Sequence, residues 1–490
     1  MASGGLLLGL IVLSIYLIAG TLMAVYARRG TRASFEEIAV AGRRLGGFLS
    51  AMTYAATTYS SFMIVGLVGF AYATGIGAYG FELVYFVATL VLLTIFAKRV
   101  WRISRERSWT TPGQMLADLA GSPRLAPLLA LVYLVALVPY ASVQLKGVGE
   151  AVAGLTGGNL YLAGVILGVI VMIVWSSIAG VWSVAVTDAF QGLWMLASAL
   201  ALLAWVAAKL TGAGVGWSEA WTMLADAGLD RVGGFWKFSV FLAFTLPWAF
   251  FAVTNPQVVQ RLFMPRDEKS LNRMIVLFGV FGLLYTILVT LIGLLARAGA
   301  EAGAIPLDPG IGKDQVTPSL LAISHPILAA VVFTSIVAAS VSTADSILVT
   351  LATEAANDLA STEAGKRRAF YASLLVVATA MVAVAAARVS YIVALSVLSS
   401  VMLLGIAPPT IALWSGMKPH PAAVWASILV APLIVAAGAI HYGSPVKAFI
   451  ATIYGIPLSG WILIMSTLLT IAGIAYGKGR GAPENTSIKV

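Results

Sequence analysis

Long apolar stretches separated by short polar segments run along the whole chain. A helix that crosses a bilayer needs about 20 mostly apolar residues, and stretches of this kind predict 13 spans. They lie near residues 5–27, 46–76, 79–103, 124–154, 160–179, 182–208, 233–264, 272–298, 326–357, 366–387, 389–416, 420–441 and 457–477. The first stretch is expected to be a span and not a cleavable signal, because its apolar run is long and residues 1–4 include no basic residue. The pattern predicts an all-α polytopic membrane protein.

Composition indicates that lipid is the solvent for most of the chain. Hydrophobic residues make up 60% of the 490 positions and charged residues 10%, against about 25% charged in ordinary soluble domains. A soluble domain could not hide so much apolar surface. We therefore expect one membrane domain, crossing the cell membrane many times.

Two further features of the composition exclude other classes. The chain has no cysteine, which rules out disulfides and thiolate metal sites, and its three histidines match no metal-ligand spacing. The net charge of +10 comes from Lys and Arg scattered between apolar runs and not gathered on one face. A nucleic-acid partner is therefore not expected.

Basic residues predict the orientation of the spans. An odd number of spans places the termini on opposite sides, and with the N-terminus outside 22 Lys and Arg, Arg261 among them, fall in inner segments against seven in outer ones. We expect the N-terminus outside and the C-terminus inside. Segments near 212–232 and 299–325 are expected to be small outer caps, and residues 478–490 a flexible cytoplasmic tail.

A polar run, Ala55-Ala56-Thr57-Thr58-Tyr59-Ser60-Ser61, interrupts the second span. Irregular backbone is tolerated in lipid only where protein or water satisfies the freed amides and carbonyls. The run would serve as an unwound hinge that offers carbonyls and hydroxyls to a cation. The alternative is that these side chains bond back to the preceding turn or to a neighbouring helix.

A second polar run, residues 338–346, lies in the ninth span. Its members Ala339, Ser342, Thr343 and Ser346 follow helical spacing and share one face. Hard cations such as Na⁺ prefer several oxygen ligands, although small residues of this kind also let two helices pack closely. The presence of Asp345 favours a functional role for this run, because placing a carboxylate within a span costs free energy.

Other charged residues within spans have two interpretations. Glu82 and Asp188 are solute or ion ligands, or else they pair with buried donors. Lys146 and Glu150 lie one turn apart and are expected to form a structural pair.

Five segments, in order over about 300 residues, carry a resemblance to the sodium:solute symporter family, which includes proline, pantothenate, sialic acid and galactose transporters. They are residues 41–46 (Ala-Gly-Arg-Arg-Leu-Gly), 60–69 with Gly66 and Gly69 in register, 180–191 with Thr187-Asp188 and Gln191, 255–261 ending in Gln260-Arg261, and Ala339-x-x-Ser342-Thr343. Ala179-Gly180 stands where the family usually has Gly-Gly.

The resemblance implies an inverted-repeat fold of the LeuT type with discontinuous helices. The first repeat would cover 46–208 and the second 233–416, with an extra N-terminal helix at 5–27 and two C-terminal helices within 420–477. Solute and ions bind near the middle of such transporters, beside broken helices.

The resemblance also implies a principal sodium site. Its ligands would be the carbonyls of Ala56, Tyr59 and Ala339 and the hydroxyls of Ser342 and Thr343, with Na⁺ as the coupling ion. A second sodium held by Asp188, Asp345 and Ser346 is a further hypothesis. The alternative is that Asp345 pairs with a nearby Arg or helix donor.

The solute is a harder question. Phe62 and Met63 stand where sugar-transporting members have Glu-Gln, so a sugar is not expected, and Thr58 stands where the proline type has an aspartate. The candidate solute ligands are Ser60, Ser61, Phe62, Met63, Glu82, Gln144, Trp248, Asn255 and Gln257.

The resulting prediction is sodium-coupled uptake of a small polar solute, such as a monocarboxylate or an amino acid like proline or alanine. A proton-coupled permease that uses Glu82, Asp188 or Asp345 as its relay remains open, as does symport of pantothenate or another solute. An enzyme is not expected, because no nucleophile–base pair or metal cluster is apparent. A sensor is not expected either, because the family's sensors carry an appended kinase region. The partners would be the solute, sodium and the bilayer, with the oligomeric state open.

Overall fold

The computed structural model describes residues 2–29 and 34–479. Eleven of its helices are long and apolar enough to cross a membrane, and one further span is a bent pair of shorter helices. The predicted tail from residue 480 onward lies outside the described residues. The all-α class that the apolar pattern predicted is confirmed.

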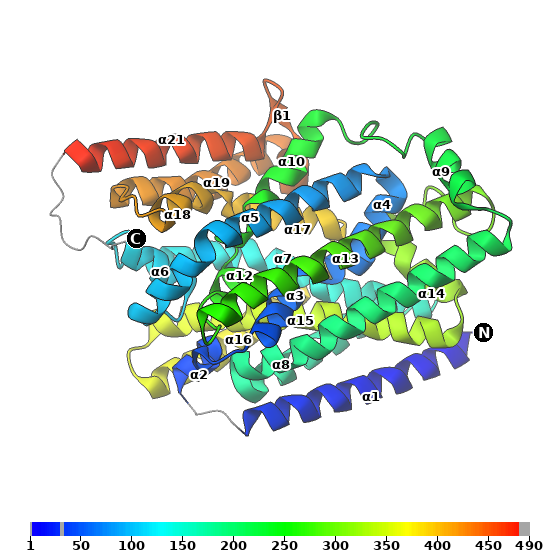
Figure 1. The fold of residues 1–490 in the computed structure, drawn as a ribbon, viewed down its shortest axis with the longest axis horizontal. Helices are drawn as coiled ribbons and strands as arrows, with labels where there is room; N and C mark the ends of the chain where they lie inside the picture. Colours follow the sequence, from blue (N-terminus) through cyan, green and yellow to red (C-terminus); the bar gives the residue numbers. More distant parts are fainter. Residues whose placement is uncertain (1, 30–33, 480–490) are drawn as a thin grey trace.

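The elements follow one another with few long loops (Figure 1). In chain order they are α1 (Ala2–Arg28), α2 (Phe35–Val40), η1 (Ala41–Arg43), α3 (Gly47–Thr58), η2 (Phe62–Leu67), α4 (Val68–Thr74), α5 (Gly77–Glu106), α6 (Pro112–Leu119), α7 (Leu125–Leu155), α8 (Tyr161–Gly212), α9 (Trp217–Asp226), α10 (Phe238–Ala249), α11 (Phe251–Thr254), α12 (Pro256–Arg261), α13 (Glu268–Glu301), η3 (Lys313–Gln315), α14 (Val316–Ile323), α15 (Pro326–Leu359), α16 (Glu363–Ala386), α17 (Ile392–Leu403), η4 (Leu404–Ile406), α18 (Ala407–Trp414), α19 (Pro421–Tyr442), α20 (Pro445–Ile450), β1 (Thr452–Ile453), β2 (Ile456–Pro457) and α21 (Leu458–Gly479). The two short strands form an antiparallel hairpin in which Thr452 pairs with Pro457.

Helix α8 covers two of the predicted spans. It runs for 52 residues, but its backbone turns at Gly180, where φ is +60°, so that 161–178 and 180–212 are separate membrane-spanning stretches. A side chain at this position would be strained, and its Cβ would lie 2.8 Å from Cα of Ile38. Glycine therefore allows both the turn and the close approach of α2.

The buried fraction of each helix shows how far it lies from the centre of the bundle. In the most apolar part of α15, 83% of the residues are buried, against 28% for α1. Helix α15 packs against α7, α8 and α16, while α1 (blue in Figure 1) lies along one edge of the bundle. The ninth predicted span is therefore at the core, and its polar face is enclosed by other helices.

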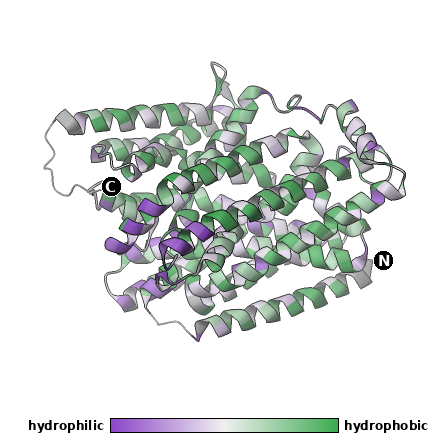
Figure 2. Ribbon diagram, viewed as in Figure 1, coloured by the Kyte–Doolittle hydropathy of each residue, from purple (hydrophilic) through white to green (hydrophobic). Residues whose placement is uncertain are grey.

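The two ends of the bundle differ in polarity. Hydrophilic residues gather at the end that holds α2 and α6, whereas the helix walls are mostly hydrophobic (Figure 2). Helix α1 starts at the other end, which also holds α9, and α21 finishes at the end that holds α6 (Figure 1). Below, the end with α9 and η3 is called the outer end, following the orientation that the basic residues predict.

Two charge assignments made from the sequence are wrong. Arg261 was counted among the basic residues of an inner segment, but its side chain is fully buried. Lys146 pairs with Asp314 and not with Glu150, which faces Arg388 at 3.6 Å. In both cases the side chain contacts residues that are distant in sequence. The linear pattern of charges does not reveal such contacts.

Candidate functional site at two helix breaks

The polar run in the second span breaks the helix, as predicted. Helix α3 ends at Thr58, Tyr59 has extended backbone (φ −95°, ψ 102°), and the chain resumes as the π-helical η2 and then α4. The two halves are bent by 50°. Because the last carbonyls of a helix lack intrahelical partners, the break frees the main-chain oxygens near Ala56 and Tyr59.

The predicted face of α15 meets this break. The hydroxyls of Ser342 and Thr343 donate to the carbonyl oxygen of Ala56, at 3.0 and 3.1 Å. The Ser342 hydroxyl also lies 3.1 Å from the carbonyl oxygen of Ala339. Four of the five residues proposed for the principal sodium site are thus joined by contacts, and the fifth, Tyr59, follows Ala56 by one turn.

These oxygens have the chemistry of a monovalent-cation site. Ala56, Ala339, Ser342 and Thr343 are fully buried, so a cation among them would lose its water. Neutral carbonyl and hydroxyl dipoles can replace that water, as hard cations require. Among the described residues, no group of three or more His, Cys, Asp or Glu is arranged to hold a metal ion.

The residues of the hypothetical second sodium site each bind a different partner. Asp345 accepts from the Ser176 hydroxyl at 2.7 Å, and Asp188 accepts from the Thr53 hydroxyl at 2.6 Å. Ser346 accepts a hydrogen bond of 2.6 Å from the guanidinium of Arg261. The positive charge of Arg261 also acts on Asp188. A fixed cation therefore already stands beside two of the three candidate ligands.

The candidate solute ligands around the first break come together. Gln144 of α7 accepts from both the amide and the hydroxyl of Ser61, at 3.3 and 2.8 Å. The Ser60 hydroxyl accepts from the amide of Phe62, whose ring lies 4.5 Å from that of Trp248. Met63 is fully buried in the same segment.

A second break positions the remaining candidates. The predicted span 233–264 consists of α10, α11 and α12, with extended backbone at Asn255 (φ −88°, ψ 113°) before Pro256. Asn255 donates to the Thr254 hydroxyl at 3.1 Å and accepts from the Gln257 amide at 3.4 Å. Pro256 lacks an amide hydrogen and suits the first turn of α12, which explains why the chain restarts there.

Several buried polar atoms near these breaks have no protein partner among the described residues. Among them are both carboxylate oxygens of Glu82, the hydroxyl of Tyr85, Nε1 of Trp248 and Oε1 of Gln257. Buried polar atoms without a partner cost free energy and call for an explanation. A polar ligand enclosed here would supply the missing partners. All nine candidate solute residues are at most 2% exposed, so the site is sealed from both ends.

Two residues of this region were not selected from the sequence. Tyr140 of α7 lies beside Ser60 and Glu82, and Arg261 reaches Ser346. Arg261 stands in the Gln-Arg motif, which was a usable signal. Tyr140 lies in an ordinary apolar stretch, so nothing in its local sequence marks it.

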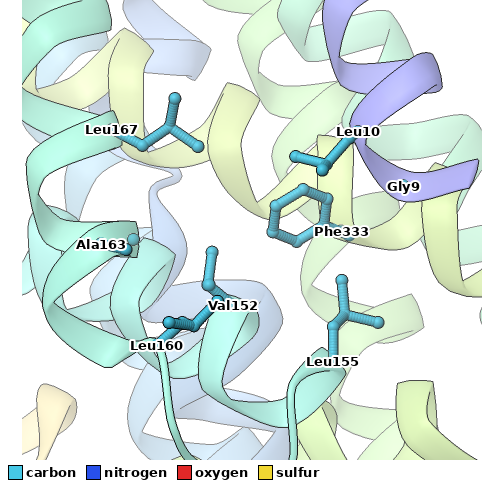
Figure 3. A pocket seen from close by; sticks show the side chains of 9 residues that line it. Gly9, Leu10, Val152, Leu155, Leu160, Ala163, Leu167 and Phe333 are labelled. Atoms are coloured by element: carbon cyan, nitrogen blue, oxygen red, sulfur yellow. The ribbon is translucent and has the colours of Figure 1, made fainter. Parts of the chain in front are cut away.

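An apolar hollow of about 150 Å³ elsewhere in the molecule is not part of this site. It lies between α1, α7, α8 and α15 and is lined by Gly9, Leu10, Val152, Leu155, Leu160, Ala163, Gly164, Leu167 and Phe333 (Figure 3). None of these residues carries a polar side chain, so the hollow offers nothing to orient a polar solute.

Comparison with known proteins identifies the family to which this arrangement belongs. The model of the sodium:solute symporter family matches residues 39–442, which include both breaks and α15. The chain belongs to the sodium:solute symporter family. It is therefore a multi-pass membrane transporter and not an enzyme.

Individual relatives agree with this membership. The sodium/pantothenate symporter of Haemophilus influenzae is 26% identical over 351 residues, which cover 70% of each chain. The symporter YodF of Bacillus subtilis is 30% identical over 122 residues, and this match spans about a quarter of each chain (25% of this one, 24% of YodF). A substrate-bound, outward-open Na⁺-coupled sialic acid symporter has the same fold, with a TM-score of 0.77 at 18% identity, covering 95% of this chain and 98% of that one. The fold is thus the LeuT type that the sequence predicted.

Proposed function

We propose that the chain couples Na⁺ entry to the uptake of a small carboxylate, with an amino acid as the preferred solute. The contact of the Ser342 and Thr343 hydroxyls with the freed carbonyl of Ala56 carries the sodium part of the proposal. These neutral oxygens have no charge of their own, so the ion brings the positive charge into the site. That charge favours an anionic group on the solute that follows.

The carboxylate end of the solute would lie at the first break. There, the Ser60 and Ser61 hydroxyls stand at the start of η2 and α4, where a half-helix directs its positive end towards the break. The rings of Phe62 and Trp248 would cover an apolar flank. The pantothenate of the Haemophilus relative is also a carboxylate, in keeping with this class of solute.

Glu82 favours an amino acid over a simple monocarboxylate. Its two carboxylate oxygens are fully buried and lack a protein partner. An ionised Glu82 would repel an anion, whereas it would bind the ammonium group of a zwitterion. Sodium and Glu82 would then hold opposite ends of the solute.

Uptake into proteoliposomes tests this function. Radiolabelled alanine or proline should accumulate when a sodium gradient is imposed at fixed pH, and unlabelled alanine or proline should compete more strongly than lactate or pyruvate. Galactose should not compete, because Phe62 and Met63 offer its hydroxyls no partners. Accumulation driven by a proton gradient alone would overturn the sodium assignment in favour of a proton-coupled permease.

A further inference from the structure

A buried ion pair joins three elements at the outer end. The ammonium of Lys146, on α7, lies 2.5 Å from a carboxylate oxygen of Asp314, on η3, and their side chains are only 9% and 8% exposed. Lys146 also donates to the carbonyl of Ser390 at 2.7 Å, and Asp314 accepts from the amide of Ile392 at 3.1 Å. The pair therefore connects α7 and η3 to the first turn of α17.

The neighbouring lysine is held by aromatic rings. The ammonium of Lys313 lies 4.8 Å from the ring centre of Phe70 and 4.7 Å from those of Phe235 and Tyr391. Burial lowers the pKa of Lys313 to about 8, and the charge of Asp314 opposes this effect. The group is thus mostly an ammonium at neutral pH, the form that aromatic faces attract.

The main chain of η3 lies directly on the outer half of the broken helix. A Cβ at Gly69 of α4 would be 1.7 Å from the carbonyl oxygen of Lys313. The Thr317 hydroxyl of α14 donates to the carbonyl of Ile64 at 2.7 Å. Since η2 and α4 follow the break towards the outer end, η3 and α14 cover the segment that joins the break to that end.

Helix α7 connects this cover to the site. Gln144, which binds Ser61 at the break, precedes Lys146 by two residues. Gly147 packs on the same serine, because a Cβ there would lie 2.6 Å from Cβ of Ser61. A displacement of α7 at the break therefore moves Lys146 relative to Asp314.

We propose that Lys146, Lys313 and Asp314 form an outer latch, a set of charges that holds η3 closed over the transport path and opens when α7 moves. Two oppositely charged side chains satisfy each other only while α7, η3 and α17 are together. Separation exposes both charges to water, which hydrates them well. The latch is thus stable both closed and open, and it resists intermediate arrangements in which one charge is buried alone.

Thiol labelling in intact cells tests the latch. The chain has no native cysteine, so Ser340→Cys, near Gly147 and Ser61, provides a single reporter inside the path. A membrane-impermeant charged thiol reagent would be added from outside, without solute and without sodium. The assay is therefore independent of the proposed solute and coupling ion, and a failure of uptake would not be mistaken for a failure of the latch.

In this background, Lys146→Met and Asp314→Asn should each raise the labelling rate at least roughly tenfold, because each leaves a buried charge unpaired when the outer end is closed. The exchanged pair Lys146→Asp with Asp314→Lys should slow labelling only in part, because it restores the opposite charges but sets a carboxylate against the Ser390 carbonyl and an ammonium against the Ile392 amide. Arg388→Ala is the matched control, because it removes a nearby, half-exposed partner of Glu150 at 3.6 Å and should leave the rate unchanged.

Lys313→Met provides a second test if the single variants of the ion pair do not accumulate as folded protein. It removes the ammonium from the three rings but keeps the ion pair, and the rate should rise roughly fivefold. Rates within twofold of the parent for folded Lys146→Met, Asp314→Asn and Lys313→Met would overturn the proposal. Faster labelling only in inverted vesicles would overturn it too, since the latch would then close the cytoplasmic end.

Discussion

Where the first helix break meets α15, the polar atoms in contact are neutral. The carbonyls of Ala56 and Ala339 and the hydroxyls of Ser342 and Thr343 contact one another without any formal charge. At the outer end, Lys146, Lys313 and Asp314 are charged and already have partners. Neutral dipoles suit the mobile cation that we propose here, since such an ion must enter and leave. Paired charges need no ligand, so they suit a contact that is either made or broken.

The largest expected effect comes from filling the close contact at the outer end. Gly69→Ala would place a Cβ 1.7 Å from the Lys313 carbonyl oxygen, and overpacking against backbone is expected to cost roughly 3 kcal/mol. Uptake should fall steeply while the protein remains folded, as checked by thermal unfolding. Gly80→Ala, whose Cβ would lie 3.5 Å from Phe241, is the control and should transport like the parent. Parental uptake by Gly69→Ala would show that the outer end does not close this tightly.

Substitutions in the neutral region should change the sodium dependence of uptake and not the stability of the fold. Ser342→Ala and Thr343→Ala each remove one hydroxyl ligand, which should cost about 1.5–3 kcal/mol of binding and raise the sodium concentration for half-maximal uptake roughly 10- to 100-fold. Thr334→Val on the same helix removes a hydroxyl that, among the described residues, bonds to the carbonyl of Ala330 alone, and it should leave the sodium dependence intact. Equal sodium dependence in all three variants would show that the ion does not bind at this position.

Glu82 is the exception within the neutral region, because it is an acid whose buried carboxyl oxygens have no protein partner among the described residues. Glu82→Gln keeps its shape and should weaken competition by alanine roughly tenfold, since a charge-assisted bond to the solute ammonium is lost. Competition by lactate should be unchanged or improved. If alanine and lactate lose affinity to the same extent, Glu82 does not bind the ammonium group of the solute.

The smallest effect is expected for an exposed ion pair at the opposite end of the bundle. Lys98 and Glu268 lie 2.6 Å apart, but their side chains are 52% and 44% exposed. Water and salt screen such a pair, so Lys98→Ala should change the free energy of unfolding by only about 0–1 kcal/mol. Thermal unfolding would check this, and a loss as large as that of Lys146→Met would mean that burial does not distinguish the two pairs.

Local patterns predicted much of the architecture and part of the candidate site. Apolar runs gave the long helices, and the polar run 55–61 gave the break between α3 and η2. Helical spacing placed Ala339, Ser342 and Thr343 on one face, which does meet the break. These features are encoded within one or two turns of chain, where the period of the helix decides which residues share a face. The exact number of spans, the orientation of the termini and the role of each candidate ligand remain predictions.

Only the packing of the whole bundle decided which distant residues meet. Lys146 is close to Glu150 in sequence, yet its partner is Asp314, 168 positions away. Arg261 has the sequence context of an inner-surface residue, yet it is buried beside Ser346. Glu82 has no mark in its local sequence that distinguishes a paired acid from an unpaired one. A buried charge takes the partner that the surrounding helices bring to it, and that choice depends on how α5, α7, α12 and α15 pack together and not on the residues next to it in the chain.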